Sequence, residues 1–195
     1  MKRRTLLQSL VAALFVRRRG AALLAEQAPA ALTEANVTTL RALADVVLPS
    51  ALGDAGKAAA VDRFVTWVRD YREGADRGHS YGASVLSPVT GPSPAGRYPP
   101  QFAALDQAAS AHGGATFSAL GAPERRAVVE AALNEDPRAT GLPARPNGTS
   151  LIADFMGMYF ASESAYDLAY NAAIGRDTCR GLDDSGKAPA ALGRG

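Results

Sequence analysis

Cysteine is nearly absent from this chain of 195 residues, which contains only Cys179. A single cysteine cannot form an internal disulfide, so the fold has to be held by packing alone. No C-x-x-C pair and no cluster of cysteine with histidine is present, which argues against a structural zinc site. The C-x-x-C-H motif that attaches haem is also missing.

Nucleotide-binding motifs are missing as well. The chain has no G-x-G-x-x-G for a dinucleotide and no G-x-x-x-x-G-K-[ST] for a nucleotide phosphate. No other pattern of residues forms a credible acid–base pair or metal site. We therefore expect no catalytic residue, no metal and no cofactor in this chain itself.

One short motif favours a different interpretation. Residues 78–82 match G-x-S-x-G, the sequence around the nucleophilic serine of α/β-hydrolases, which would make Ser80 a nucleophile. That serine has to lie on a strained turn between a strand and a helix, whereas here a helical pattern precedes it and prolines follow. The base would be His79 or His112, and Asp106 would have to orient His112 from the same short helix. A serine hydrolase is a minor alternative to a glycine-rich loop that contains a serine.

Charge is distributed unevenly along the chain. The whole sequence has 21 basic and 19 acidic residues and a formal net charge of +2, and six of the bases but none of the acids lie within the first 25 residues. The remainder therefore has 15 bases, 19 acids and a net charge of −4. A mildly acidic domain without a cluster of lysine and arginine argues against nucleic acid or anionic lipid as a partner.

The first 30 residues are predicted to be an export signal. Arg3 and Arg4, one spacer, and then Leu6 and Leu7 resemble the twin-arginine signal, with an apolar run that ends at Val16. This run is too short to cross the hydrocarbon of a membrane, which needs about 20 residues. Three arginines follow it directly, which suits export of a folded protein through the twin-arginine translocase. The expected location is therefore the periplasm.

Signal cleavage is expected after Ala25 or after Ala30, since small residues precede both positions. The alternative is a misplaced start codon ahead of a cytoplasmic protein. The predicted organisation is a signal over residues 1–30, a helical domain over 31–180 and a flexible tail over 181–195.

Helical patterns dominate the chain beyond the signal. We expect helices over 34–48, 58–73, 101–112, 124–134 and from Ser150 onward. No alternating strand pattern and no internal repeat is visible. The sequence predicts an all-α fold, a single compact domain of about five helices with long loops rich in glycine and proline.

Local signals define several of these helices. Thr33 is a good N-cap for the first helix and Pro49 ends it, and a turn is expected over 50–57. Ser150 is expected to cap the last helix, whose apolar side chains form one broad buried stripe. That stripe comprises Leu151, Phe155 and Tyr159 with Ile152, Met156 and Phe160, and a continuing helix would extend the Tyr159 line through Glu163, Tyr166 and Tyr170.

The segment 74–100 contains five glycines and five prolines, so no helix is expected to cross it. Loops of this length tend to be functional or disordered. We predict a partner-binding arm with apolar anchors along it, and an ordinary disordered loop is the alternative. These anchors are Tyr81, Val85, Leu86, Val89 and Tyr98. Trp67 and Tyr71 are expected at the rim of the core, with partner contact as the alternative.

Most of the chain beyond the signal resembles the small subunit (subunit 3) of the gluconate 2-dehydrogenase family. The matching stretches are the twin-arginine leader, LRALADVVLP at 40–49, YPPQFAALD at 98–106, the aromatic helix 155–160 and YNAAIG at 170–175. These are packing and turn patterns, and none of them is a catalytic signature.

The resemblance implies an accessory, non-catalytic subunit of a periplasmic flavin-dependent sugar or polyol dehydrogenase. Its implied partners are a large flavoprotein subunit that holds FAD and a multihaem cytochrome c as a third subunit. Only the small subunit of the family carries the signal, so the folded flavoprotein would travel with it. The alternative function is a freestanding exported helical domain that binds a small ligand or another protein.

Cys179 lies between Arg176 and Arg180, where the chain turns polar. Nearby guanidinium groups would favour the thiolate, and an unpaired thiol in an oxidising compartment favours an intermolecular bond. We therefore predict a disulfide between Cys179 and the catalytic subunit. A buried, reduced thiol under the tail is the alternative.

Overall fold

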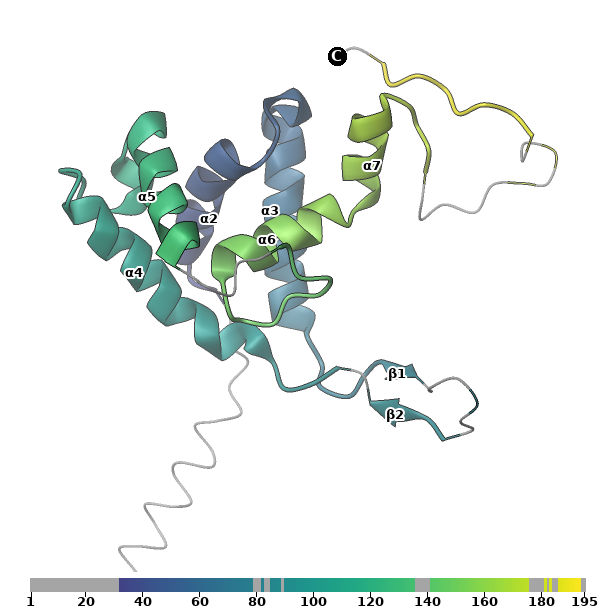
Figure 1. Cartoon of the computed structure of the whole chain (residues 1–195), viewed down its shortest axis with the longest axis horizontal. Helices are drawn as coiled ribbons and strands as arrows, with labels where there is room; N and C mark the ends of the chain where they lie inside the picture. The colour runs from purple at the N-terminus through teal and green to yellow at the C-terminus, as the bar shows by residue number, and fades with distance from the viewer. Residues whose placement is uncertain are drawn as a thin grey trace, which may run out of the picture. The chain divides into compact units, whose positions relative to one another are not determined.

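A computed structural model describes residues 32–78, 82, 85–88, 90–135, 141–175, 181, 183 and 186–193. The chain divides into two units, Met1–Ala30 and Ala31–Gly195, and the described residues all belong to the second. This second unit is mostly helical, with six α-helices among the described residues (Figure 1). The prediction of a compact all-α domain is confirmed.

The first two helices form a packed pair. Helix α2, Glu34–Val47, begins with a capping box in which the Thr33 hydroxyl accepts from the Asn36 N–H and the Asn36 side chain accepts from the Thr33 N–H. It ends before Pro49, as expected. Helix α3, Gly53–Asp70, follows a short 3₁₀ turn, so the predicted turn over 50–57 is wrong for most of its length. The Lys57 Nζ atom forms an ion pair with Oδ1 of Asp45 in α2 at 3.3 Å, and this contact joins the early part of α3 to α2.

The next two helices are held by side chains that bond the backbone. Helix α4, Tyr98–Ser110, begins earlier than expected because Pro99 and Pro100 occupy its first turn, where a missing N–H is tolerated. The Asp106 carboxylate then accepts from the Phe117 N–H at 2.8 Å. Helix α5, Ala122–Glu135, carries Arg125, whose guanidinium reaches Asp45 at 3.4 Å and donates to the Ser118 carbonyl at 2.9 Å. The start of α5 is therefore fixed against the end of α2.

The expected long last helix is in fact two helices, α6 (Leu151–Phe160) and α7 (Glu163–Tyr170). Ser150 caps α6 as predicted. The chain breaks at Ser162, whose hydroxyl accepts from the Ala165 N–H and so begins a new helix. The buried stripe is also narrower than predicted, because Phe160 is 40% exposed while Tyr159 is buried.

The core gathers around Phe64 of α3. The centroid of its ring lies 5.6 Å from the ring centroids of both Tyr98 and Phe155, and the contact with Phe155 is edge-to-face. Helix α2 packs against α3 and α5, and α6 packs against α3 and α5 (Figure 1). The aliphatic part of this core includes Leu40, Leu43, Val61, Leu105, Val128 and Leu151.

Two short pairings of extended chain were not expected. Strands β1 (Arg77–Gly78) and β2 (Ser87–Pro88) form an antiparallel hairpin inside the glycine- and proline-rich segment. The second pairing joins Ala172 to Ala191, with the Ala173 N–H donating to the Ala190 carbonyl at 2.7 Å. The tail, which was expected to be flexible, is thus paired at this point with the segment that follows α7. No helix in the described part of the chain is long and apolar enough to cross a membrane.

Candidate partner-binding surfaces

A buried carboxylate joins three segments of the chain. Asp154 is the only charged residue of α6, and only 1% of its surface is exposed to solvent. Its Oδ2 atom accepts from the Tyr98 hydroxyl at 3.0 Å, the Asn147 N–H at 3.1 Å and the Gly148 N–H at 2.6 Å. The start of α4, the loop before α6 and α6 itself therefore meet at one oxygen atom.

Burial raises the pKa of Asp154 above its usual range, because a carboxylate inside the protein loses its hydration. The two N–H groups and the Tyr98 hydroxyl act in the opposite direction. The Oδ1 atom is buried and has no partner among the described residues. Burial likewise raises the pKa of Tyr98 well above its usual range. This pair is enclosed by the core, so its geometry suits a structural junction.

A second set of bonds surrounds this junction. The Gln101 amide donates to the Arg97 and Gly148 carbonyls at 2.9 and 3.0 Å and accepts from the Leu151 N–H at 2.6 Å. Gly148 has φ +77°, and a Cβ there would lie 2.8 Å from Cδ of Arg97. Glycine is therefore required where the loop passes close to the start of α4.

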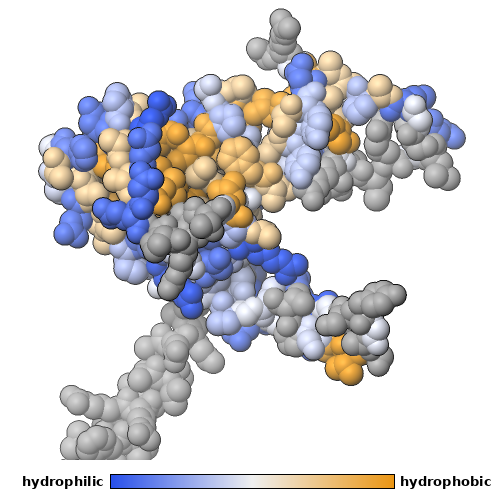
Figure 2. Space-filling view, in the orientation of Figure 1, coloured by the Kyte–Doolittle hydropathy of each residue, from blue (hydrophilic) through white to orange (hydrophobic). Residues whose placement is uncertain are grey.

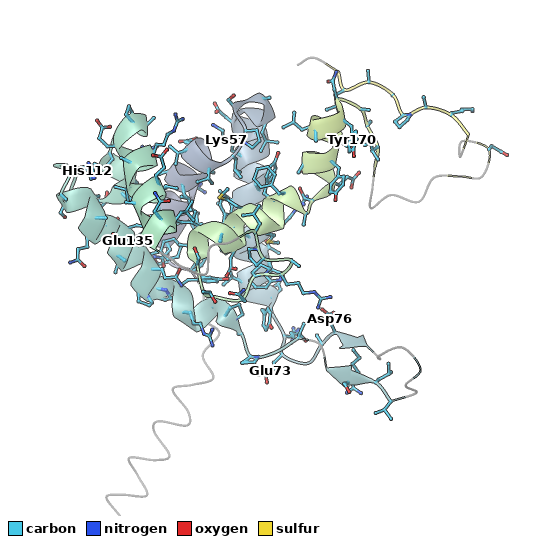
Figure 3. All side chains as sticks on the ribbon, viewed as in Figure 1. Lys57, Glu73, Asp76, His112, Glu135 and Tyr170 are labelled. Atoms are coloured by element: carbon cyan, nitrogen blue, oxygen red, sulfur yellow. The ribbon has the colours of Figure 1, made fainter. Side chains whose placement is uncertain are left out.

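A broad groove lies beside these bonds, between α4, α5 and the start of α6. Its volume is about 920 Å³. His112 and Glu135, labelled in Figure 3, are among the polar side chains that line it. Most of its wall is small or apolar, and includes Ala104, Leu105, Ala108, Val128, Ala132 and Ile152. Such a surface suits an apolar ligand or the face of another protein.

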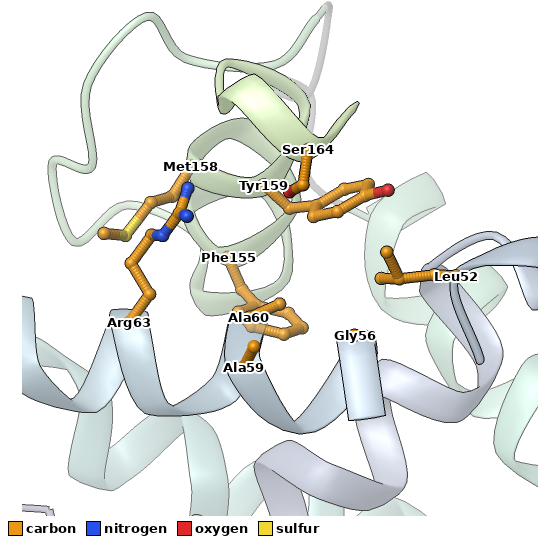
Figure 4. A pocket seen from close by; sticks show the side chains of 9 residues that line it. All are labelled: Leu52, Gly56, Ala59, Ala60, Arg63, Phe155, Met158, Tyr159 and Ser164. Carbon is orange, nitrogen blue, oxygen red and sulfur yellow. The ribbon is translucent and has the colours of Figure 1, made fainter. Parts of the chain in front are cut away.

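A smaller pocket of about 110 Å³ lies between α3, α6 and α7 (Figure 4). Phe155 and Tyr159 form its inner wall and are buried, whereas Ala59, Arg63 and Ser164 are exposed at its mouth. The Tyr159 hydroxyl is buried without a hydrogen-bond partner among the described residues, and burial raises its pKa. The pocket is thus an apolar recess with a cation at its edge.

The hairpin presents apolar side chains to solvent. Val85 and Leu86 are 72% and 53% exposed just before β2, and apolar surface is visible near the tip of the hairpin in Figure 2. The Tyr71 hydroxyl donates to the Gly91 carbonyl at 2.7 Å, and the Gly74 N–H donates to the Thr90 carbonyl at 3.1 Å. These bonds fix the base of the hairpin to the end of α3.

Two other predicted contact residues lie in or beside the core. Tyr98 is fully buried and bonded to Asp154, so its assignment as a partner contact is wrong. Its position at the first turn of α4 turns the ring inward against Phe64. Trp67 is half-buried, with ring centroids 6.1 Å from Phe64 and 5.2 Å from Tyr71. It forms the rim of the aromatic core, as expected.

The remaining predicted residues lie outside the described part of the chain. They are Arg3, Arg4, Leu6 and Leu7 of the signal, His79, Ser80, Tyr81 and Val89 of the hairpin segment, and Cys179. The hydrolase alternative loses support, because in the described part of the chain Asp106 accepts from the Phe117 N–H and makes no hydrogen bond to His112. Among the described residues no three His, Cys, Asp or Glu side chains gather as a metal site.

The fold and these surfaces define a small helical domain that is suited to binding other molecules. A family model described as Gluconate 2-dehydrogenase subunit 3 matches residues 34–174, a range that includes all six helices. The chain belongs to this family. No curated protein and no solved structure matches it.

Proposed function

We propose that this chain is the non-catalytic small subunit of a periplasmic, flavin-dependent sugar or polyol dehydrogenase of the gluconate type. In this role it carries the folded catalytic subunit through twin-arginine export and stabilises it. The observation that supports the proposal most directly is the family match across the helical body of the chain. The match supports an accessory subunit of a dehydrogenase complex.

The division of chemistry between subunits follows from this proposal. The large subunit holds FAD and oxidises the substrate, and a cytochrome subunit with haem c accepts the electrons. The environment of Asp154 supports this division of chemistry. Its carboxylate is enclosed by the core and is hydrogen-bonded to three donors of its own chain. This chain contributes binding surface and the export signal.

Export of the complex then depends on Arg3 and Arg4. The twin-arginine route carries folded proteins, so a flavoprotein without a signal crosses only while it is bound to this chain. Among the described residues, the surfaces suited to that contact include the exposed hairpin residues and the recesses of the helical domain.

The test is co-expression of the full chain with a flavoprotein dehydrogenase subunit that comes from the same genome and has no signal of its own. Both proteins and the flavin absorbance should appear in the periplasmic fraction. Changing Arg3 and Arg4 to lysine should leave both in the cytoplasm, whereas changing Arg18 and Arg19 to lysine serves as a matched control. Periplasmic flavoprotein in the absence of the small subunit would overturn the proposal.

A second candidate function is a freestanding domain that binds a small ligand. The groove favours it, because its volume of about 920 Å³ falls within the range of roughly 300–1,000 Å³ typical of ligand sites. Native mass spectrometry of the purified chain tests this alternative. A retained small molecule that is lost from Ala104→Leu and Ala108→Leu variants, with no flavoprotein partner, would favour it over the accessory role.

A further inference from the structure

We propose that the pocket between α3, α6 and α7 is an anchor pocket, which receives one apolar side chain of the dehydrogenase subunit while a neighbouring carboxylate of that subunit pairs with Arg63. This inference rests on the proposed function and assigns it a contact surface. It uses the recess drawn in Figure 4.

The size of the pocket selects the kind of occupant. Its volume is about 110 Å³, below the roughly 300 Å³ at which ligand sites begin and somewhat smaller than the cavity of about 150 Å³ that holds benzene. A whole sugar or a flavin does not fit such a space. One aliphatic side chain with about four carbons does, and a side chain inserted from a partner is the usual anchor of a protein interface.

The walls keep this space open. Ala59 and Ala60 are small, so that α3 leaves a recess beneath α6. The Phe155 ring that lines it is held edge-to-face against Phe64, so the inner wall is supported by the core. Gly56 contributes as well, since a Cβ there would lie 2.5 Å from Cγ of Leu52 and displace that side chain from the wall. The pocket is therefore preformed.

The charge at the mouth of the pocket selects for an acidic partner segment. Arg63 is exposed there, and among the described residues no acid pairs with its guanidinium, whereas Lys57 on the same helix is paired with Asp45. Ser164, on the opposite side of the mouth, is neutral. A planar guanidinium forms two parallel bonds with a carboxylate, and this pair becomes stronger as the docked partner excludes water. The matching partner segment thus has an apolar side chain next to Asp or Glu.

Two variants test the pocket separately from its charge. Ala60→Leu fills the recess, and Arg63→Glu reverses the charge at the mouth without touching the core. Matched controls are Ala103→Leu and Arg126→Glu, which change exposed positions on α4 and α5 that line neither recess. Each full-length variant is co-expressed with the flavoprotein subunit, and the dissociation constant of the purified pair is measured by biolayer interferometry. Circular dichroism and a melting curve check the fold.

Filling the pocket should weaken binding about thirtyfold, the effect of losing one hot-spot residue. Charge reversal should weaken it about tenfold, and that loss should become smaller as the salt concentration is raised. A photo-crosslinker at Ala59 should attach to a partner segment in which an apolar residue adjoins Asp or Glu. Changing that acid to arginine should then restore binding to Arg63→Glu.

The outcomes distinguish the two proposals. If the unaltered chain binds no flavoprotein, the accessory function itself is wrong. If it binds, but Arg63→Glu and folded Ala60→Leu bind within about twofold of it, the anchor pocket alone is wrong. Weakening by Ala104→Leu or Ala108→Leu with the pocket variants unaffected would move the contact to the groove. If Ala60→Leu fails to fold, the binding of Arg63→Glu and the crosslink from Ala59 test the anchor pocket instead.

Discussion

The buried Asp154 junction yields a sharp prediction about stability. In Asp154→Ala, the Tyr98 hydroxyl and the Asn147 and Gly148 N–H groups lose their shared acceptor. Each buried donor left unpaired costs about 1–3 kcal/mol. Part of this total cost is offset, because the variant no longer has to bury a carboxylate. We expect the free energy of unfolding to fall by about 3 kcal/mol, as is typical when one member of a buried charged network is removed.

The sign of the pH dependence follows from the raised pKa of Asp154. Because its native pKa lies above the unfolded value near 4, the native state binds more protons in the window between the two. The stabilising contribution of the protonated group is complete below about pH 4 and is lost as the pH rises through the native pKa. An Asp154→Asn variant, which keeps one acceptor oxygen, should lose this dependence and should be destabilised less than Asp154→Ala.

Urea unfolding of the full chain, followed by fluorescence, measures both effects. Trp67 is the only tryptophan, and it lies against Phe64, which itself contacts Tyr98. A loss of 3 kcal/mol should lower the urea midpoint by about 1–2 M. A loss below 1 kcal/mol for Asp154→Ala, together with an unchanged pH profile, would refute the assignment of Asp154 as the junction of the three segments.

Three further predictions concern single positions. Gly148→Ala should reduce the free energy of unfolding by about 2 kcal/mol in urea titrations, because φ is +77° and a Cβ would meet Arg97. Leu86→Asp should weaken capture of the flavoprotein without changing the melting temperature, since Leu86 is exposed; an altered melting curve would contradict this. Cys179→Ser should abolish a reductant-sensitive heterodimer band on a denaturing gel. If the small subunit of the unaltered complex runs as a monomer both with and without reductant, the disulfide prediction is wrong.

Local signals in the sequence predicted the helix boundaries that depend only on neighbouring residues. Thr33 and Ser150 cap their helices, and Pro49 follows the end of α2, because these effects act within one turn. The start of α3 was missed because it has no such local signal. Leu52 stands at its N-cap without a side-chain hydrogen bond, and the glycine content had favoured a turn.

The candidate sites were less accessible from sequence. Tyr98 lies beside two prolines and was expected in a loop, yet its ring packs against Phe64 and its hydroxyl donates a hydrogen bond to Asp154, 56 positions later. The signal that could have found this pair is the single acid within the otherwise apolar run 151–160. The pocket at Arg63 leaves no sequence motif, since its space arises from alanines and a glycine that face another helix.

Helix α3 connects the two surfaces proposed for partner binding. Arg63 lies at the pocket, and Tyr71, just beyond the helix end, holds the base of the hairpin; their separation of eight residues corresponds to a rise of about 12 Å. A standard interface covers about 800 Å² on each partner, a patch roughly 30 Å across, so one partner can cover both positions.

Double-variant binding tests this shared interface. If one partner contacts both surfaces, losses of binding free energy from Arg63→Glu and Leu86→Asp should add within about 0.5 kcal/mol, because distant independent contacts add. The control pair combines Arg126→Glu with Leu86→Asp and should equal Leu86→Asp alone. If Leu86→Asp leaves capture unchanged, the hairpin lies outside the interface and the helical domain alone binds the dehydrogenase.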